Sequence, residues 1–88
     1  MYRVRLAKRA ERNLGRIRQG DPRAYDRIKA AIIALGADPR PPGVTKLRGV
    51  QPPAWRLRVG EYRIVYEILD GELVVLVVNV AVRGEIYK

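Results

Sequence analysis

The apolar positions in the first half of the chain follow two different periods, and each period predicts a different element. Residues 2–6 alternate between apolar and basic side chains, which predicts a first β-strand. Over about residues 8–20 the apolar side chains recur with the 3.6-residue period of an amphipathic helix. Asp21 as N-cap and Pro22 at the first helical position then predict a second helix, which Gly36 is expected to close. Two helices joined by so short a turn predict an αα-hairpin that covers one face of a sheet.

The second half of the chain predicts strands. The proline-rich stretch at residues 38–43 suits neither a helix nor a central strand, so we expect a stiff connector there. Trp55–Val59 alternates strictly, and Gly60-Glu61 forms a plausible two-residue turn into a second strand, Tyr62–Leu69. The tyrosines at positions 62 and 66 share the apolar face of this hairpin with Trp55. We therefore expect these aromatic side chains in the core.

A further hairpin and a central strand complete the predicted sheet. Asp70-Gly71 predicts a second two-residue hairpin, which sets Arg63 opposite Val78. The strand Leu73–Val82 is apolar on both faces, so we expect it to be central and covered on both sides. The predicted order is β-α-α-β-β-β in one α+β domain spanning residues 1–88. Its αα-hairpin packs on one face of a mostly antiparallel, twisted sheet.

The first hairpin carries a cluster of arginines on one face. Pairing Val59 with Tyr62 across the turn sets Arg58 opposite Arg63, and Arg56 points to the same side. Like charges placed directly across two strands repel each other, so folding alone gives no reason for this arrangement. A bound polyanion does give one. The alternative interpretation is a solvated sheet face whose arginines only confer solubility.

Composition favours a polyanionic partner and limits the available chemistry. The 88 residues include 18 Lys or Arg against 9 Asp or Glu, a formal net charge of +9, and so basic a domain is drawn to nucleic acid or to an acidic protein. Cysteine and histidine are both absent, which removes disulfides, the commonest metal ligands and the usual general base near neutral pH. We therefore expect neither a metal ion nor another cofactor. The alternating first residues are unlike a signal peptide, and the longest apolar run is too short to span a membrane, so a cytoplasmic protein with no membrane partner is expected.

Four segments, taken in order, resemble the RelE-type toxins of the RelE/ParE superfamily of bacterial and archaeal toxin–antitoxin modules. They are Lys46-Leu47-Arg48-Gly49, Gly60-Glu61-Tyr62-Arg63-Ile64-Val65-Tyr66, Asp70-Gly71 and Arg83-Gly84-Glu85-Ile86-Tyr87. The resemblance covers essentially the whole chain and implies a RelE-like fold. It also implies a ribosome-dependent endoribonuclease, or mRNA interferase, which cleaves mRNA in the ribosomal A site and inhibits translation. In that metal-independent reaction the 2′-hydroxyl attacks the adjacent phosphate and gives a 2′,3′-cyclic phosphate.

The same resemblance implies roles for five residues. Arg63 and Arg83 would stabilise the phosphate in the transition state, and Arg56 would hold the RNA. Arg58 stands where relatives often have a lysine suited to proton transfer. Tyr87 would stack on a nucleobase or assist proton transfer. Because arginine does not readily lose its proton and histidine is absent, Tyr87 is the main candidate for the general base.

Two more basic residues flank the predicted site, and the place of Arg83 in it depends on how the last strand pairs. Lys46 and Arg48 are candidates for contacts with RNA phosphates, with a solvated sheet edge as the alternative interpretation. Regular pairing of the last strand would put Arg83 on the face opposite Arg63. If Arg83 belongs to the site, a β-bulge must intervene, and we expect it within Asn79–Gly84.

The resemblance implies an acidic antitoxin, encoded by an adjacent gene, as the constant partner. The other implied partners are the 30S A site of the ribosome with its mRNA, and operator DNA bound through the antitoxin. Two alternatives stay open, of which one is a ParE-like protein that inhibits DNA gyrase by contact and cleaves nothing. The other is a catalytically weak toxin that acts with its antitoxin as a corepressor. The arginine cluster favours the nuclease, because a gyrase inhibitor has no need of a phosphate-centred group.

Overall fold

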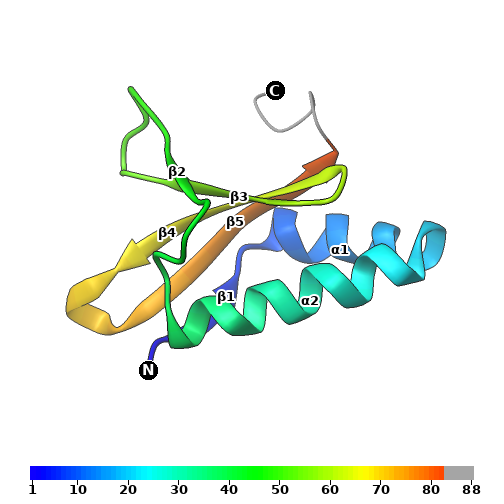
Figure 1. The fold of residues 1–88 in the computed structure, drawn as a ribbon, viewed down its shortest axis with the longest axis horizontal. Coiled ribbons are helices and arrows are strands. Elements are labelled where there is room, and N and C mark those ends of the chain that lie inside the picture. The colour runs from blue at the N-terminus through cyan, green and yellow to red at the C-terminus, as the bar shows by residue number, and fades with distance from the viewer. Residues whose placement is uncertain (83–88) are drawn as a thin grey trace.

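The computed structural model describes residues 1–82, which form a five-stranded sheet with two helices against one face (Figure 1). The elements are β1 (Arg3–Leu6), α1 (Lys8–Gly20), α2 (Pro22–Ala37), β2 (Thr45–Lys46), β3 (Trp55–Val59), β4 (Tyr62–Leu69), a 3-10 turn η1 (Asp70–Glu72) and β5 (Val74–Val82). The strand order across the sheet is β1-β5-β4-β3-β2. β1 runs parallel to β5, and the other neighbours are antiparallel. The predicted α+β fold is confirmed, with the short edge strand β2 as an addition.

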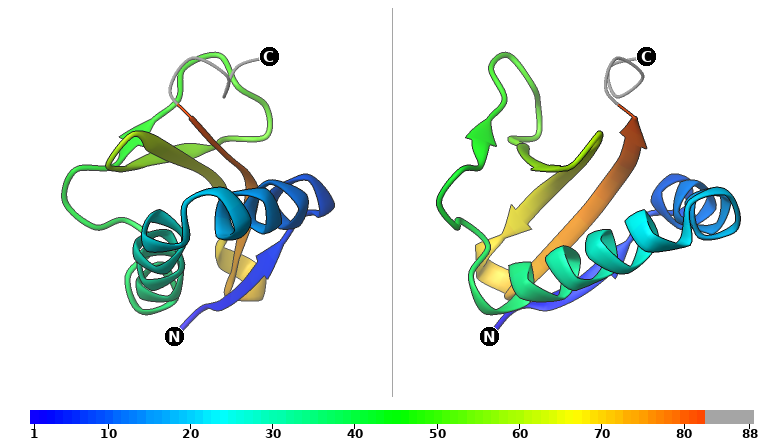
Figure 2. Two further views of the ribbon diagram at one scale, coloured as in Figure 1. Left: turned by 90° about the vertical axis from the view of Figure 1, so that its right-hand side faces the viewer. Right: turned by 45° about the vertical axis from the view of Figure 1, so that its right-hand side comes forward.

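The two helices start and pack largely as their sequence predicts. The Asp21 carboxylate accepts a hydrogen bond of 3.2 Å from the Ala24 N–H and so caps α2, which begins at Pro22. In α1 the residues Leu14 and Ile17 are buried on one side. Figure 2 shows both helices on the same side of the sheet, as the αα-hairpin prediction requires. Neither helix within residues 1–82 is long and apolar enough to cross a membrane.

Gly36 does not close the second helix as predicted, because α2 continues through Ala37. A methyl group on Gly36 would lie 3.0 Å from the Tyr2 carbonyl oxygen and 3.3 Å from Val4 Cγ2. The Tyr2 N–H donates a hydrogen bond of 2.7 Å to the Gly36 carbonyl oxygen. The absence of a side chain at Gly36 therefore lets β1 approach α2 closely.

The β3–β4 hairpin has the register that the sequence predicts. Val59 pairs with Tyr62 across the turn, and Arg58 pairs with Arg63. Gly60 has a φ of 58°, the left-handed conformation that suits glycine at the first central position of such a turn. The prediction of a two-residue connection between these strands is confirmed.

The predicted two-residue hairpin after β4 is wrong. Asp70–Glu72 forms a 3-10 turn, Leu73 follows in the left-handed conformation with a φ of 54°, and Leu69 pairs with Val74. The Leu73 carbonyl oxygen accepts a hydrogen bond of 2.8 Å from the Arg3 N–H. The wider turn thus supplies a hydrogen-bond acceptor to the neighbouring strand β1. The Asp70-Gly71 pattern could not predict this contact, because it concerns only the two turn residues.

The pairing of β4 with β5 shifts by one residue halfway along the ladder. Val65 pairs with Asn79, whereas Tyr66 pairs with Val77, so Val78 is an extra residue in β5. A single extra residue of this kind is a β-bulge. Beyond it the two strands continue in a new register.

The bulge decides which residue of β5 faces the arginine cluster. Arg63 pairs with Ala81, so the predicted pairing of Arg63 with Val78 is wrong. The sequence predicts the bulge within Asn79–Gly84, and the structure places it one residue earlier, at Val78. With this bulge an odd-numbered residue of β5, Ala81, lies opposite Arg63. The predicted placement of Arg83 on the same face lies outside the described residues.

The hydrophobic core lies between the helices and the sheet. Its buried members are Ala10, Leu14, Ile17, Ala24, Ile28, Ile32, Leu35, Ile64, Tyr66, Val75, Val77 and Val80. Tyr66 is fully buried, and its ring stacks on Trp55 with centroids 6.5 Å apart, so the predicted core position of these aromatic residues is confirmed. β5 is an inner strand as predicted. Its second face is not covered by the helices, but a smaller cluster of Ala54, Val65 and Ala81 packs there, with Leu47 and Val78 against it. Leu76 and Val78 stay partly exposed, so the prediction of cover on both faces is confirmed only in part.

Candidate nucleic-acid interface

The arginines of the β3–β4 hairpin lie on the sheet face opposite the helices. Arg58 pairs directly with Arg63, and Arg56 precedes Arg58 by two residues and therefore points to the same side. Arg58 is exposed and Arg56 is half-buried, whereas Arg63 is only 9% exposed. We call Arg56, Arg58 and Arg63 the arginine face. The structure brings these three residues together as the alternation of the sequence predicts.

A small pocket opens at the turn end of the arginine face. It has a volume of 70 Å³ and is lined by Arg58, Gly60, Glu61 and Arg63. A volume of this size admits a few water-sized groups. That size and the basic lining suit the oxygens of one phosphate group.

No ion pair within residues 1–82 neutralises the guanidinium groups that line this pocket. Neither Arg58 nor Arg63 forms an ion pair with an acidic side chain of residues 1–82. Buried charges in proteins are normally paired, because removing an ion from water costs several kcal/mol otherwise. The buried position of Arg63 therefore favours an anionic ligand at this place.

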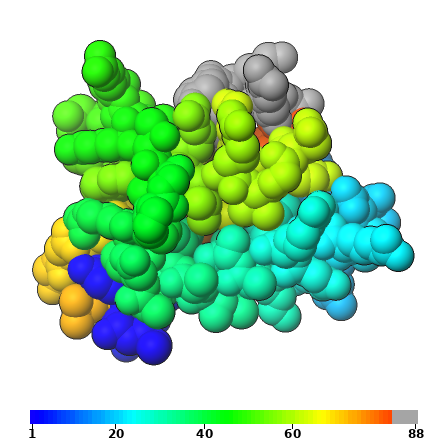
Figure 3. Space-filling model, in the orientation of Figure 1, coloured from blue at the N-terminus to red at the C-terminus, as the bar shows by residue number. Residues whose placement is uncertain are grey.

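A fourth guanidinium group reaches the turn from the helical layer. A methyl group on Gly60 would lie 3.6 Å from Nη2 of Arg27, which belongs to α2. Figure 3 shows the yellow-green atoms of the hairpin resting against the cyan and green atoms of α2. Sequence reasoning missed Arg27, since the helical pattern of α2 does not reveal which of its charged residues lies beside the turn. It also missed Glu61, which it treated only as a turn residue.

Two predicted catalytic residues, Arg83 and Tyr87, lie outside the described residues 1–82. The described part of β5 ends with the pairs Arg63–Ala81 and Tyr62–Val82. This register brings the end of β5 alongside the arginine face. The roles of Arg83 and Tyr87 stay predictions.

Lys46 and Arg48 do not join the arginine face. Lys46 pairs with Trp55, so its side chain leaves the sheet on the side opposite that of Arg56. Its ammonium nitrogen lies 5.7 Å from the centre of the Trp55 ring, where Arg40 also approaches to 5.2 Å. Arg48 is exposed in the loop after β2. If these residues bind RNA, they do so at a place separate from the pocket.

Polar contacts around Trp55 hold the connector between α2 and β2 onto the sheet. The Tyr66 hydroxyl donates a hydrogen bond of 2.7 Å to the Pro39 carbonyl oxygen, and burial raises the pKa of Tyr66 to about 12. Arg40 forms an ion pair of 2.9 Å with Asp70, and this hydrogen bond keeps the pKa of Asp70 below its usual value. We interpret these contacts as structural.

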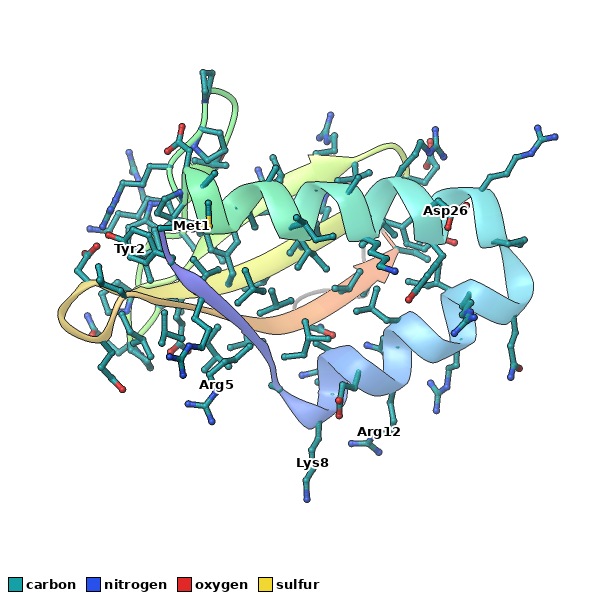
Figure 4. All side chains as sticks on the ribbon, turned by 90° about the horizontal axis from the view of Figure 1, so that it is seen from below. Met1, Tyr2, Arg5, Lys8, Arg12 and Asp26 are labelled. Atoms are coloured by element: carbon teal, nitrogen blue, oxygen red, sulfur yellow. The ribbon has the colours of Figure 1, made fainter. Side chains whose placement is uncertain are left out.

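Further basic residues lie outside the arginine face, on α1 and on β1. Arg5 of β1 pairs with Leu76 and so points to the sheet face that the helices leave open, whereas Lys8 and Arg12 belong to α1. Arg5, Lys8 and Arg12 project outward from β1 and α1, as the view from below shows (Figure 4). All three are exposed. Basic side chains therefore occupy both sides of the molecule, and this distribution favours long-range attraction to a polyanion larger than one short strand.

Comparison with known proteins agrees with this fold and charge distribution. A family model described as the ParE toxin of the type II toxin–antitoxin system, parDE, matches residues 4–87. A comparison with curated protein sequences finds no match.

Solved structures of toxins share the whole fold. One chain in the crystal structure of the archaeal RelE–RelB complex from Pyrococcus horikoshii is 26% identical, with a TM-score of 0.80 over 96% of this chain and 97% of that chain. For the RelBE2 toxin–antitoxin complex from Mycobacterium tuberculosis the identity is 26% and the TM-score 0.78, over 93% of this chain and 98% of that chain. The isolated E. coli RelE toxin is 25% identical, with a TM-score of 0.78 over 99% of this chain and 92% of that chain.

Proposed function

This chain belongs to the ParE toxin family of type II toxin–antitoxin systems, within the RelE/ParE superfamily, and from that premise we propose that it is a ribosome-dependent endoribonuclease. Its substrate would be mRNA in the ribosomal A site, and its cleavage would stop translation. The observation that carries the proposal is the direct pairing of Arg58 with Arg63 beside a pocket of phosphate size. Repulsion between the two guanidinium groups costs stability, and a phosphate bound between them offsets that cost.

The proposed reaction needs charge stabilisation above all. Attack of a 2′-oxygen on phosphorus places additional negative charge on the phosphate oxygens, and fixed cations aimed at them lower the barrier. Arg58 and Arg63 line the pocket and would stabilise that charge, while Arg56 would hold the neighbouring backbone. Arg83 is proposed as a further cation, and Tyr87 as a stacking or proton-transfer residue.

The proposed partner is an acidic antitoxin encoded by the adjacent gene. The matched solved structures include complexes described as RelE–RelB and RelBE2 toxin–antitoxin complexes, and the net charge of +9 complements an acidic segment. The antitoxin would neutralise the toxin by covering the arginine face, and the complex would bind operator DNA through the antitoxin.

The test is primer extension on a defined mRNA in ribosomes whose A site is vacant. Wild-type protein is expected to cut within the A-site codon, and only when ribosomes are present. Arg63→Ala should lower the cleavage rate by about 10²- to 10³-fold, the usual effect of removing one preorganised donor to transition-state charge. Arg23→Ala is the matched control, because Arg23 is an exposed arginine of α2 that lines neither the pocket nor the arginine face.

Since Arg63 is buried, its loss could also unfold the protein. Thermal unfolding followed by circular dichroism controls for that, and Arg58→Ala gives a second test at an exposed position. Absence of cleavage by folded wild-type protein that demonstrably occupies the A site would overturn the proposal.

A second function is favoured by one specific observation. The family model that matches residues 4–87 is described as ParE, and a ParE-like protein would inhibit DNA gyrase by contact without cutting RNA. A supercoiling assay with purified gyrase separates the two functions. Inhibition that persists in Arg58→Ala, together with the absence of RNA cleavage, would establish the gyrase function in place of the nuclease.

A further inference from the structure

The turn of the β3–β4 hairpin places a carboxylate among the guanidinium groups. Glu61 is the second residue of the Gly60-Glu61 turn and lines the same 70 Å³ pocket as Arg58 and Arg63. It is the only acidic residue that lines this pocket within the described part of the chain. Arg27 approaches the other side of the turn, next to Gly60. The Glu61 carboxylate therefore shares a pocket with two guanidinium groups, those of Arg58 and Arg63.

Nothing in residues 1–82 neutralises this carboxylate by direct contact. No ion pair or hydrogen bond joins the Glu61 side chain to another side chain of the described residues, although Arg58 and Arg63 line the same pocket. The Glu61 residue is exposed to solvent, and its oxygens are thus available to a ligand. A salt bridge that only stabilises the hairpin would show a close contact between these charges.

The chemistry at the pocket requires a proton acceptor. A 2′-hydroxyl must lose its proton as its oxygen attacks phosphorus, and arginine remains protonated in proteins. Histidine and cysteine are absent from the whole sequence. Among the described side chains that line the pocket, only the carboxylate of Glu61 can accept a proton near neutral pH.

We propose that Glu61 is the general base of the reaction, an inference that rests on the proposed nuclease function. Arg58 and Arg63 hold the scissile phosphate in the pocket, and Glu61 takes the proton of the 2′-hydroxyl beside it. The bond between the 2′-oxygen and phosphorus forms while the bond between phosphorus and the 5′-oxygen breaks. The leaving 5′-oxygen takes a proton from water, and the resulting hydroxide removes the proton from Glu61. The products are a 2′,3′-cyclic phosphate and a 5′-hydroxyl.

The arrangement also suits proton transfer to a carboxylate that lies beside two guanidinium groups. As the proton leaves the 2′-hydroxyl, negative charge moves from the carboxylate to the phosphate. The same guanidinium groups can follow that movement without rearrangement, because both acceptors share one pocket.

The test compares single-turnover cleavage rates of A-site mRNA by wild type, Glu61→Gln and Glu72→Gln at saturating toxin. Glu61→Gln should lower the rate by about 10²- to 10⁴-fold, the range for losing a general base. Its affinity for the ribosome should be equal or higher, because the substitution removes a negative charge from a basic site. Glu72→Gln is the matched control, since Glu72 is an exposed glutamate in the turn at the other end of β4. It should cleave at the wild-type rate.

A pH–rate profile separates a base from a merely structural residue. With a carboxylate base the wild-type rate stays level between about pH 6 and 9, because carboxylic acids ionise near pH 4. The residual activity of Glu61→Gln, in contrast, should rise about tenfold per pH unit as hydroxide replaces the base. A structural defect would lower the rate without changing the shape of the profile.

Four outcomes overturn the inference. A wild-type rate that climbs steadily to about pH 10 indicates a phenol or an amine as the base and leaves the nuclease function intact. Full activity of Glu61→Gln would show that Glu61 is not the general base. A pH–rate profile of Glu61→Gln that has the wild-type shape at a reduced rate would show the same. Either result leaves the nuclease function intact. Absence of cleavage by the wild-type protein would refute both the role of Glu61 as general base and the nuclease function.

Discussion

Two glycines in helices should respond in opposite directions when each is changed to alanine. A methyl group on Gly15 of α1 would meet no atom within 4 Å outside its own helix backbone, whereas one on Gly36 of α2 would lie 3.0 Å from the Tyr2 carbonyl oxygen. Alanine is favoured over glycine inside a helix by about 0.5–1 kcal/mol. Gly15→Ala should therefore stabilise the protein by about that amount.

At Gly36 the same helical gain is outweighed. The new methyl group would be too close to the Tyr2 carbonyl oxygen and 3.3 Å from Val4 Cγ2, so β1 must shift. Overpacking of this kind costs about 1–3 kcal/mol. The shift also weakens the hydrogen bond of 2.7 Å from the Tyr2 N–H to the Gly36 carbonyl oxygen, at a cost of about 1 kcal/mol. Gly36→Ala should thus destabilise the protein by about 1–3.5 kcal/mol in total.

The assay is urea unfolding at equilibrium, followed through the fluorescence of Trp55, the single tryptophan of the chain. The free energies of unfolding of the two variants should differ by about 1.5–4.5 kcal/mol. In a domain of this size that difference separates their melting temperatures by roughly 6–36 °C. If Gly36→Ala stabilises the protein as Gly15→Ala does, β1 does not lie against α2 as described, and the reasoning fails.

Two further predictions concern buried and strained groups. Burial raises the pKa of Tyr66 to about 12, so its contribution to stability is complete below about pH 10, the pKa of an exposed tyrosine, and is lost as the pH rises from there through 12. Tyr66→Phe should lower the free energy of unfolding by about 1 kcal/mol at pH 8, because the Pro39 carbonyl oxygen loses its hydrogen-bond donor. When unfolding is measured at several pH values, the free energy of unfolding of this variant should decline less steeply above pH 10 than that of the wild type. Leu73→Gly should raise the free energy of unfolding by about 1 kcal/mol, because Leu73 is half-exposed and has a φ of 54° that glycine adopts without strain. A lower melting temperature of Leu73→Gly in calorimetry would contradict the left-handed conformation of this residue.

The parts of the fold that the sequence predicts are those in which one period dominates. Strict alternation from Trp55 to Val59 fixes the face of each side chain, and Gly60 fixes the turn, so the pairing of Arg58 with Arg63 follows. The capping residues before α2 act just as locally, through the hydrogen bond from the Ala24 N–H to Asp21.

The errors fall where the alternation is lost. Residues 73–78 of the last strand are all apolar, so moving the register by one residue exchanges one apolar side chain for another. No pattern in the sequence marks Val78 as the bulged residue or Leu73 as part of the turn. In the same way, Gly36 looks like the end of a helix in sequence, and only its contact with Tyr2 shows that it is a packing position.

The candidate site likewise contains residues that local sequence patterns predict and residues that they do not. Arg56, Arg58 and Arg63 belong to one hairpin, and their meeting is a local property of that hairpin. Arg27 comes from α2, and its approach to Gly60 depends on how the helical layer packs on the sheet. Glu61 is near in sequence but carries no periodic signal, because turn residues belong to neither face of a strand.

The parallel pairing of β1 with β5 has a consequence for the timing of toxin synthesis. Arg3 pairs with Val74, so the first strand to be translated waits for the last of the described strands before it has a neighbour in the sheet. β5 also lies between β1 and β4, where it supports the strand that bears Arg63. A nascent chain can form its αα-hairpin and the β3–β4 hairpin early, since their contacts are local, but the sheet is joined only after β5 has emerged. The ribosome that makes this protein therefore has to synthesise β5 before the arginine face acquires its folded support.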